Sequence, residues 1–200
     1  MQGRIEGEIL RKVMRCVPSP VTVVTVCGEN EIRGITIGSF ASTSLRPPLI
    51  SFNVNKDATI YPALMVAERF VVHILTDQQA HLSDHFAKPD LPAEEQFEAI
   101  PYRLDPHGTP ILLDTLAVIS CERYAVHEAG DHSIVVGHVL DVEERSGCSP
   151  LVYHDRTYRR LGEEVEPTLF EPLEEGSRVS VLGSQAAEQR TENREPRTKR

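Results

Sequence analysis

Runs of β-branched and other apolar residues, separated by short polar segments, recur along most of the chain. Residues 21–26 (VTVVTV) and 32–37 (IRGITI) are two such runs, and the segment 28–30 (GEN) between them is typical of a hairpin turn. A third strand is predicted over 47–55 (PPLISFNVN), which begins with prolines because proline cannot donate to a sheet ladder. The chain therefore opens as an antiparallel sheet.

Two short helices and a strand are predicted in the middle of the chain. The segment 58–70 (ATIYPALMVAERF) is expected to form the first helix, and 69–75 (RFVVHIL) has the continuous apolar character of a buried strand. The second helix is expected over 76–87 (TDQQAHLSDHFA), with Thr76 or Asp77 as its N-cap. Helices this short suit the crossovers of a sheet.

The later part of the pattern predicts a long hairpin and a final pair of short strands. Two alternating runs within 116–144 are joined at 128–131, and 150–162 (PLVYHDRTYRRLG) adds the short strands. A short first helix is expected within 1–17. Six or more mostly antiparallel strands with small crossover helices indicate a mainly β fold of the α+β type, a closed or nearly closed β-barrel.

The character of the sequence changes after Gly162. Residues 163–200 show little apolar periodicity, and their end offers almost nothing to bury. We therefore expect one folded domain over 1–162 and a C-terminal tail over 163–200 that is mostly disordered.

Charge and composition exclude several classes of partner. A formal net charge of -9 argues against a nucleic-acid partner, which needs clustered Lys and Arg. No apolar run approaches the roughly 20 residues that cross a bilayer, and the N-terminus lacks an apolar signal core. The scattered cysteines are typical of reduced thiols: Cys16, Cys27, Cys121 and Cys148. We expect a cytoplasmic protein with no membrane partner.

Several familiar catalytic and binding motifs do not occur in the sequence. Neither GxGxxG nor GxxxxGK[ST] is found, so a Rossmann unit or a P-loop is unsupported, and no GxSxG elbow exposes a serine nucleophile. His81 and His85 are one helical turn apart, but no third ligand is evident, so no metal is expected.

A segment rich in serine and threonine lies between two apolar runs, within 34–55 (GITIGSFASTSLRPPLISFNVN). Its short hydroxyls and accessible backbone N–H groups could cradle an anion or the polar edge of a flat ring. A serine-rich turn has the same composition, so composition leaves both interpretations open. Lys56, just beyond, would supply a countercharge to a phosphate, although a lone lysine is usually a solvated surface residue.

Two further segments contain candidate binding residues. His132 enters a strand at a turn edge, where an imidazole could meet a ligand or simply face solvent. Tyr153, Arg156 and Tyr158 combine a fixed cation with aromatic rings, a set that could clamp a cofactor or pack on a sheet surface.

Taken in order, these segments resemble the flavin reductase family with the FMN-binding split-barrel fold, the small reductases of two-component flavin monooxygenases. The motifs that carry the resemblance are PSPVTVVTV, GITIGSFASTSLRPPLISFNVN, LSDHFA followed by EEQFEAIPYRLDPHGTPILLDTLAVISCE, then GDHSIVVGHV and PLVYHDRTYRRL. The likeness runs from about Val13 to Gly162. It implies a split β-barrel that binds a flavin.

The resemblance also implies which residues form the site. It places the segment from Thr36 to Ser44 along the flavin ring, and the following strand end at the ring edge and phosphate. The implied flavin contacts are Thr36, Ser39, Phe40, Ser42, Ser51, Asn53, Val54, Lys56 and Thr59. By the same resemblance, the nicotinamide dinucleotide meets His132, Tyr153 and Arg156.

The implied activity is the reduction of FMN or FAD by NADH or NADPH in a homodimer that supplies reduced flavin to a separate flavin-dependent oxygenase. Hydride transfer needs two rings held at near-attack distance rather than an acid–base dyad, so His132 is expected to position the nicotinamide. One alternative is a flavin-binding electron carrier or redox sensor, and another is an interaction module that only keeps the fold. The sequence does not choose between FMN and FAD, or between NADH and NADPH.

Overall fold

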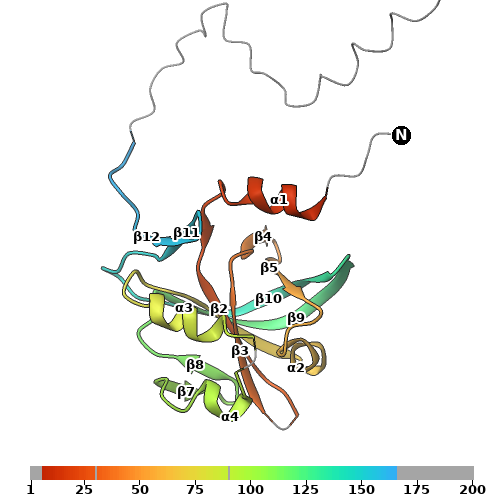
Figure 1. Cartoon of the computed structure of the whole chain (residues 1–200). Helices are drawn as coiled ribbons and strands as arrows, with labels where there is room; N and C mark the ends of the chain where they lie inside the picture. Colours follow the sequence, from red (N-terminus) through yellow and green to blue (C-terminus); the bar gives the residue numbers. More distant parts are fainter. Residues whose placement is uncertain (1–5, 30, 90, 166–200) are drawn as a thin grey trace, which may run out of the picture. The chain divides into compact units, whose positions relative to one another are not determined.

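The computed structural model describes residues 6–29, 31–89 and 91–165, and those up to Gly162 belong to one compact unit (Figure 1). The helices are α1 (Gly7–Met14), α2 (Tyr61–Val66), α3 (Ala80–Phe86) and α4 (Ala93–Gln96). The strands are β1 (Ser19–Pro20), β2 (Thr22–Cys27), β3 (Ile32–Ile37), β4 (Ala41–Leu45), β5 (Pro48–Asn55), β6 (Arg69–Ile74), β7 (Tyr102–Leu104), β8 (Pro110–Leu112), β9 (Ala117–Ala129), β10 (His132–Glu144), β11 (Val152–His154) and β12 (Thr157–Arg159).

Seven strands form the central antiparallel sheet, in the order β3-β2-β6-β9-β10-β5-β4. The outer strands β3 and β4 are joined directly by Gly38, Ser39 and Phe40. Three residues span only about 10 Å, so the two edges of the sheet must approach each other. The sheet is therefore rolled into a barrel whose opening lies at this connection, which confirms the predicted mainly β barrel.

The strand β2 explains why the first apolar run lacks alternation. Its residues Thr22 to Val26 are all buried, since both faces of the strand are covered. Val24 and Val26 belong to the core inside the barrel, together with Phe52 and Phe70 from β5 and β6. Val23 belongs to a second cluster, with residues of α3 and β8 and with Phe97, which follows α4. A strand buried on both faces needs apolar or bonded side chains at every position.

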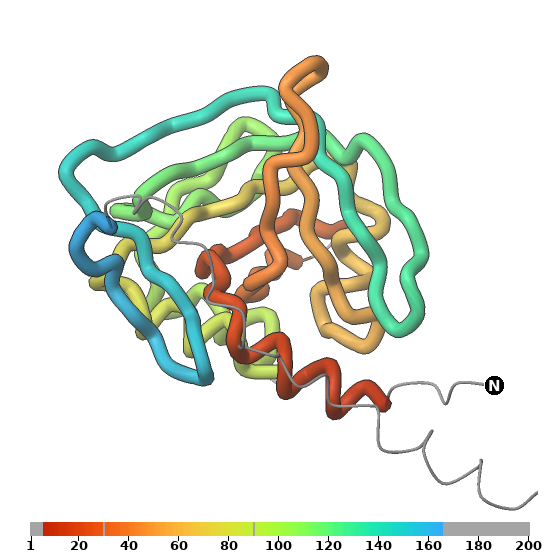
Figure 2. The backbone as a smooth tube through the Cα atoms, turned by 90° about the horizontal axis from the view of Figure 1, so that it is seen from above, coloured from red at the N-terminus to blue at the C-terminus, as the bar shows by residue number. Residues whose placement is uncertain are grey.

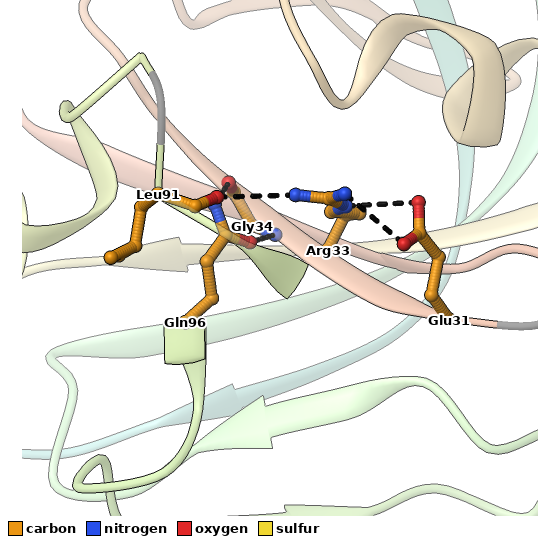
Figure 3. A network of polar contacts seen from close by, with 5 residues as sticks. All are labelled: Glu31, Arg33, Gly34, Leu91 and Gln96. Atoms are coloured by element: carbon orange, nitrogen blue, oxygen red, sulfur yellow. Dashed lines mark hydrogen bonds and ion pairs between the residues drawn. The ribbon is translucent and has the colours of Figure 1, made fainter. Parts of the chain in front are cut away.

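A glutamine covers the edge of β3. The Gln96 side chain accepts the Gly34 N–H at 2.9 Å through Oε1 and donates to the Gly34 carbonyl at 3.3 Å (Figure 3). Nearby, Arg33 pairs with Glu31 at 2.9 Å and donates to the Leu91 carbonyl. Because the amide satisfies the backbone groups of an edge strand, β3 is closed to pairing with another strand at this point.

A buried histidine ties three strands together. The N–H of Leu112 can only donate, and it lies 3.1 Å from His73 Nε2, so His73 must carry its proton on Nδ1, which lies 3.0 Å from the Val23 carbonyl. Burial lowers the pKa of His73 to about 4, although the bond to Val23 opposes this shift. The imidazole is therefore neutral at pH 7 and links β6 to β2 and β8.

The helices and strands follow the predictions with a few differences. The hairpins β2–β3 and β9–β10, the strands β5 and β6 and the final strand pair are confirmed. The prediction of the α3 cap was wrong: Gln79 precedes the helix, and its Oε1 accepts the Thr76 N–H. The expected loop from Thr36 to Ser44 is largely β-strand, since only Gly38 to Phe40 lie between β3 and β4. Of the expected tail, 166–200 lie outside the described residues.

Candidate functional site

A serine closes the opening of the barrel. Ser39 Oγ accepts the Asn53 N–H at 2.8 Å and donates to the Asn53 carbonyl at 3.3 Å, so one hydroxyl joins the β3–β4 connection to β5. Both residues are exposed. The hydroxyl thus holds a polar, solvent-facing backbone in place between two core-forming strands.

His132 lies beside the same end of β5. It faces Asn55 across the β5–β10 pair, and Lys56 N–H donates to the Asp131 carbonyl at 3.0 Å. The imidazole Nδ1 is 2.8 Å from Asp131 Oδ1, and this hydrogen bond lowers the pKa of the Asp131 carboxyl. We call Ser39, Asn53, Lys56 and His132 the strand-end set.

Lys56 combines a positive charge with a partly buried side chain. Its Nζ lies 3.7 Å from Glu128 Oε2, and its side chain is 31% exposed. A lysine held this way at a strand end remains available to an incoming anion, because the exposed glutamate partner is weakly bound.

Some of the other residues expected to contact the flavin are exposed, and others are buried in the barrel core. Ser42 and Thr59 are exposed, and Ser51 accepts a hydrogen bond from Thr43 Oγ1 at 2.9 Å. Val54 is 1% exposed and packs in the barrel core, with Phe40 partly buried against the same cluster. Val54 could therefore reach a ligand only through its backbone.

A cavity of about 470 Å³ lies on the other side of the β3–β4 connection. It joins three residues from the sequence prediction, Thr36, Tyr153 and Arg156, which are far apart in the chain. We call it the α3 cavity; its lining comprises Ser19, Pro20, Val21, Thr36, Ile37, Gly38, Ser83, Asp84, Ala87, Tyr153, Arg156 and Tyr158. Its volume and its mixture of aromatic, apolar and a few polar groups are typical of a small-molecule site.

Hydrogen bonds hold the walls of this cavity together. Thr36 Oγ1 donates to the Ser83 carbonyl at 2.7 Å, which ties β3 to α3. Tyr158 Oη lies 2.9 Å from Ser83 Oγ and 2.8 Å from Asp84 Oδ1, which ties β12 to α3. Burial raises the pKa of Tyr158, so its hydroxyl stays a donor at neutral pH. The Thr36 hydroxyl therefore supports the wall.

Arg156 stands on a strained turn. Asp155 and Arg156, between β11 and β12, have φ angles of 46° and 63°. Positive φ at both positions is required by a type I′ hairpin turn, and glycine or asparagine usually occupies the second. The Asp155 N–H donates to the Arg15 carbonyl at 3.2 Å, and the end of α1 lies beside this hairpin in both views (Figure 1, Figure 2). A non-glycine residue kept in this conformation points to a role for its side chain.

The structure groups the predicted residues differently from the sequence. His132 was expected beside Tyr153 and Arg156, but it lies in the strand-end set and is not part of the cavity lining. Conversely, Thr36 lies in the cavity. The sequence analysis did not predict Ser83 and Asp84 as site residues. Both belong to the LSDHFA motif, which contributed to the family resemblance but was given no role in binding.

A second hollow of about 710 Å³ lies beside α4, but its chemistry does not suit a nucleotide. Its rim includes Glu94, Glu95 and Glu98. Three carboxylates would repel a phosphate, so the α3 cavity is the better candidate.

Metal-binding and membrane features are absent from the described part of the chain. Residues 6–29, 31–89 and 91–165 contain no cluster of three or more His, Cys, Asp or Glu side chains that could hold a metal ion. Among the same residues, no helix has both the length and the apolar character needed to span a membrane.

Comparisons with known proteins agree on one family. Residues 14–162 match the model of the flavin reductase like domain. A flavin reductase from Pseudomonas putida is 35% identical over 159 residues, 79% of this chain and 92% of the relative. The reductase component of 4-hydroxyphenylacetate 3-monooxygenase from Thermus thermophilus is 37% identical over 157 residues, 77% of this chain and 96% of the relative.

A solved structure extends the likeness to three dimensions. The NADH:FAD oxidoreductase of Streptomyces globisporus C-1027, in complex with NAD and FAD fragments, superposes with a TM-score of 0.74 at 30% identity. The match covers 82% of this chain and 99% of that one. With a family model spanning the whole barrel and relatives covered over most of their length, this chain belongs to the flavin reductase family of split-barrel proteins.

Proposed function

We propose that this protein reduces FMN or FAD with NADH or NADPH and passes the reduced flavin to a separate oxygenase. The observation that carries the proposal is that the α3 cavity and the strand-end set meet at two consecutive residues of the chain. Gly38, which lines the α3 cavity, is followed by Ser39, which bonds to the strand end. A ligand in the cavity and a ligand on the strand end would therefore lie side by side.

The residues present fit a flavin and a nicotinamide nucleotide. Exposed hydroxyls and backbone at Ser39 and Asn53 suit the polar edge of a flat ring, and Lys56 suits a phosphate. Arg156 supplies a second cation at the cavity. A bound flavin accepts hydride from nicotinamide, so this chain has chiefly to bind and orient the two ligands.

His132 is assigned a positioning role. Its ring lies at the start of β10 beside Asn55, and the bond to Asp131 restrains its orientation. A half-exposed imidazole held in this way can pack against a nicotinamide without taking part in proton transfer.

An electron carrier or redox sensor on the same fold remains the second candidate. Such a protein needs no nicotinamide site, whereas the α3 cavity offers a cation and two aromatic rings beside the strand end. The deciding measurement is steady-state NADH and NADPH oxidation by the purified protein with FMN, with FAD and without flavin. A reductase shows flavin-dependent turnover; absence of turnover in all four pairings would favour the carrier.

We also propose a homodimer. α1 has no buried residue, and its apolar side chains Ile9, Leu10, Val13 and Met14 are between 52% and 59% exposed. An apolar helix face of this kind is usually covered by a partner. Light scattering should give twice the chain mass, and Leu10→Glu should shift the protein toward monomer.

A reducing, cytoplasmic location fits the cysteines. Cys16, Cys27, Cys121 and Cys148 are all free thiols. Burial raises the pKa of Cys121 to about 12, so this thiol is unreactive at neutral pH. A free-thiol set is typical of proteins kept in a reducing compartment.

A further inference from the structure

The carboxylate of Asp84 lies in the α3 cavity without a part in the proposed reaction. Asp84 is exposed, and its Oδ1 accepts the Tyr158 hydroxyl at 2.8 Å. A carboxylate offers roughly four acceptor sites, so one bond from Tyr158 leaves capacity for ligand hydroxyls. Because Tyr158 also bonds to the buried Ser83, the carboxylate is held at a defined place on the cavity wall.

The cavity lining matches the three parts of a nucleotide. The rings of Tyr153 and Tyr158, with centroids 5.2 Å apart, offer aromatic surface to a base. The Arg156 guanidinium offers paired donors to a phosphate. Asp84, an acceptor without a donor, suits the hydroxyls of a ribose. The strand end is left for the flavin.

We propose that Asp84 binds the ribose hydroxyls of the adenosine half of the nicotinamide nucleotide and so selects NADH against NADPH. This inference rests on the proposed function. A 2′-hydroxyl donates to the carboxylate, whereas the 2′-phosphate of NADPH cannot donate when fully ionised and brings up to two negative charges against it. In this arrangement Arg156 is assigned to the phosphates common to both nucleotides, so it adds equally to the binding of each.

The test compares Asp84→Asn with the wild type, both loaded with FMN, which contains no adenosine. Asparagine retains an oxygen for Tyr158 and removes the charge. Asp141→Asn is the matched control, because Asp141 is an exposed carboxylate on β10 that is not part of the cavity lining. Dissociation constants for NAD⁺ and NADP⁺ are measured by calorimetry, and kcat/KM for NADH and NADPH by stopped-flow.

The wild type should bind NAD⁺ at least about tenfold more tightly than NADP⁺. Asp84→Asn should reduce that preference by about tenfold, mainly through tighter NADP⁺ binding, and the kcat/KM ratio should follow. Asp141→Asn should keep the wild-type ratio. An unchanged ratio in Asp84→Asn overturns the inference.

Two further outcomes distinguish the adenosine of FAD from that of the nicotinamide nucleotide, and nucleotide binding from turnover. If Asp84→Asn alters the ratio of FAD to FMN affinity and leaves the NAD⁺ to NADP⁺ ratio unchanged, the cavity holds the adenosine of FAD and the inference is wrong. If NAD⁺ binds with the expected preference but flavin-dependent turnover is absent, the inference stands and the proposed reductase function fails.

Discussion

The strand-end set and the α3 cavity are neighbours along the chain at Gly38 and Ser39, yet they are built in opposite ways. The strand-end set comes from β5, β10 and the β3–β4 connection, and its parts are held by backbone pairing and the Ser39 bridge. The α3 cavity collects residues from β1, β3, α3, β11 and β12, held by side-chain bonds through Thr36 and Tyr158. An open strand end suits a flat ring that is exchanged, whereas a walled cavity suits selective binding.

The largest expected effect concerns the buried histidine that links β6 to β2 and β8, outside both regions. His73 has a pKa of about 4 in the folded protein and about 6.5 when unfolded, so the unfolded state binds more protons between these values. Stability must therefore fall as pH decreases through this range, by about 2 kcal/mol between pH 7 and pH 5. Urea unfolding at both pH values tests this.

His73→Gln is the control for that experiment. It should be less stable than the wild type at pH 7 but should lose much less stability on acidification. An equal pH dependence in both proteins would show that groups other than His73 are responsible.

The next prediction compares one variant in the α3 cavity, Arg156→Ala, with one in the strand-end set, His132→Ala. Arg156→Ala should raise KM for the nicotinamide nucleotide about tenfold, because it removes the cavity cation, and should leave flavin affinity within about twofold. His132→Ala should lower kcat/KM by about tenfold or more through the hydride step, since small displacements of the rings are costly. Flavin titration and stopped-flow flavin bleaching provide the measurements.

If His132→Ala keeps the wild-type rate, His132 is a turn-edge residue without a ligand. If Arg156→Ala weakens flavin and nicotinamide binding equally, the strand-end set and the α3 cavity form one site rather than two.

Ser39→Asp sharpens the strand-end half of the comparison. A carboxylate cannot donate to the Asn53 carbonyl and places negative charge beside the proposed flavin, so flavin affinity should weaken by about 1–2 kcal/mol. Ser146→Asp is the matched control and should bind flavin normally, because Ser146 is an exposed serine in the turn after β10 and belongs to neither region. Unchanged flavin affinity in Ser39→Asp would remove Ser39 from the site.

The smallest expected effect is that of Arg156→Gly, which should raise the stability of the protein while it weakens nicotinamide binding. Arg156→Gly should stabilise the protein by about 1 kcal/mol, because glycine adopts the positive φ of this turn without strain. The same change should weaken nicotinamide binding as much as Arg156→Ala does, while Arg156→Ala keeps the strained turn. Thermal melts of the three proteins decide whether strain is stored here; equal melting temperatures would show that it is not.

Much of the fold follows from local patterns. The two hairpins, the buried strand β6 and the helices α1, α2 and α3 were predicted because turn residues and apolar periods act over a few positions. No helix or strand was predicted between residues 88 and 115, where α4, β7 and β8 lie. The strand β4 was missed because serine and threonine suit loops and edge strands alike. Gln96 on the β3 edge was also missed, since its partner Gly34 is distant in sequence and only packing brings them together.

For this protein, the sequence by itself determined most of the helices and strands, the acidic character and most of the residues suited to bind a ligand, because these depend on residue type and short spacing. Tertiary structure alone decided how that set is divided. It placed His132 with Ser39 and Asn53, since β10 pairs with β5. It placed Thr36 with Tyr153 and Arg156, since the last hairpin pairs with β1, which leads directly into β2, the neighbour of β3. It also brought Asp84 and Tyr158 together across 74 residues of the chain, a contact that no local pattern encodes.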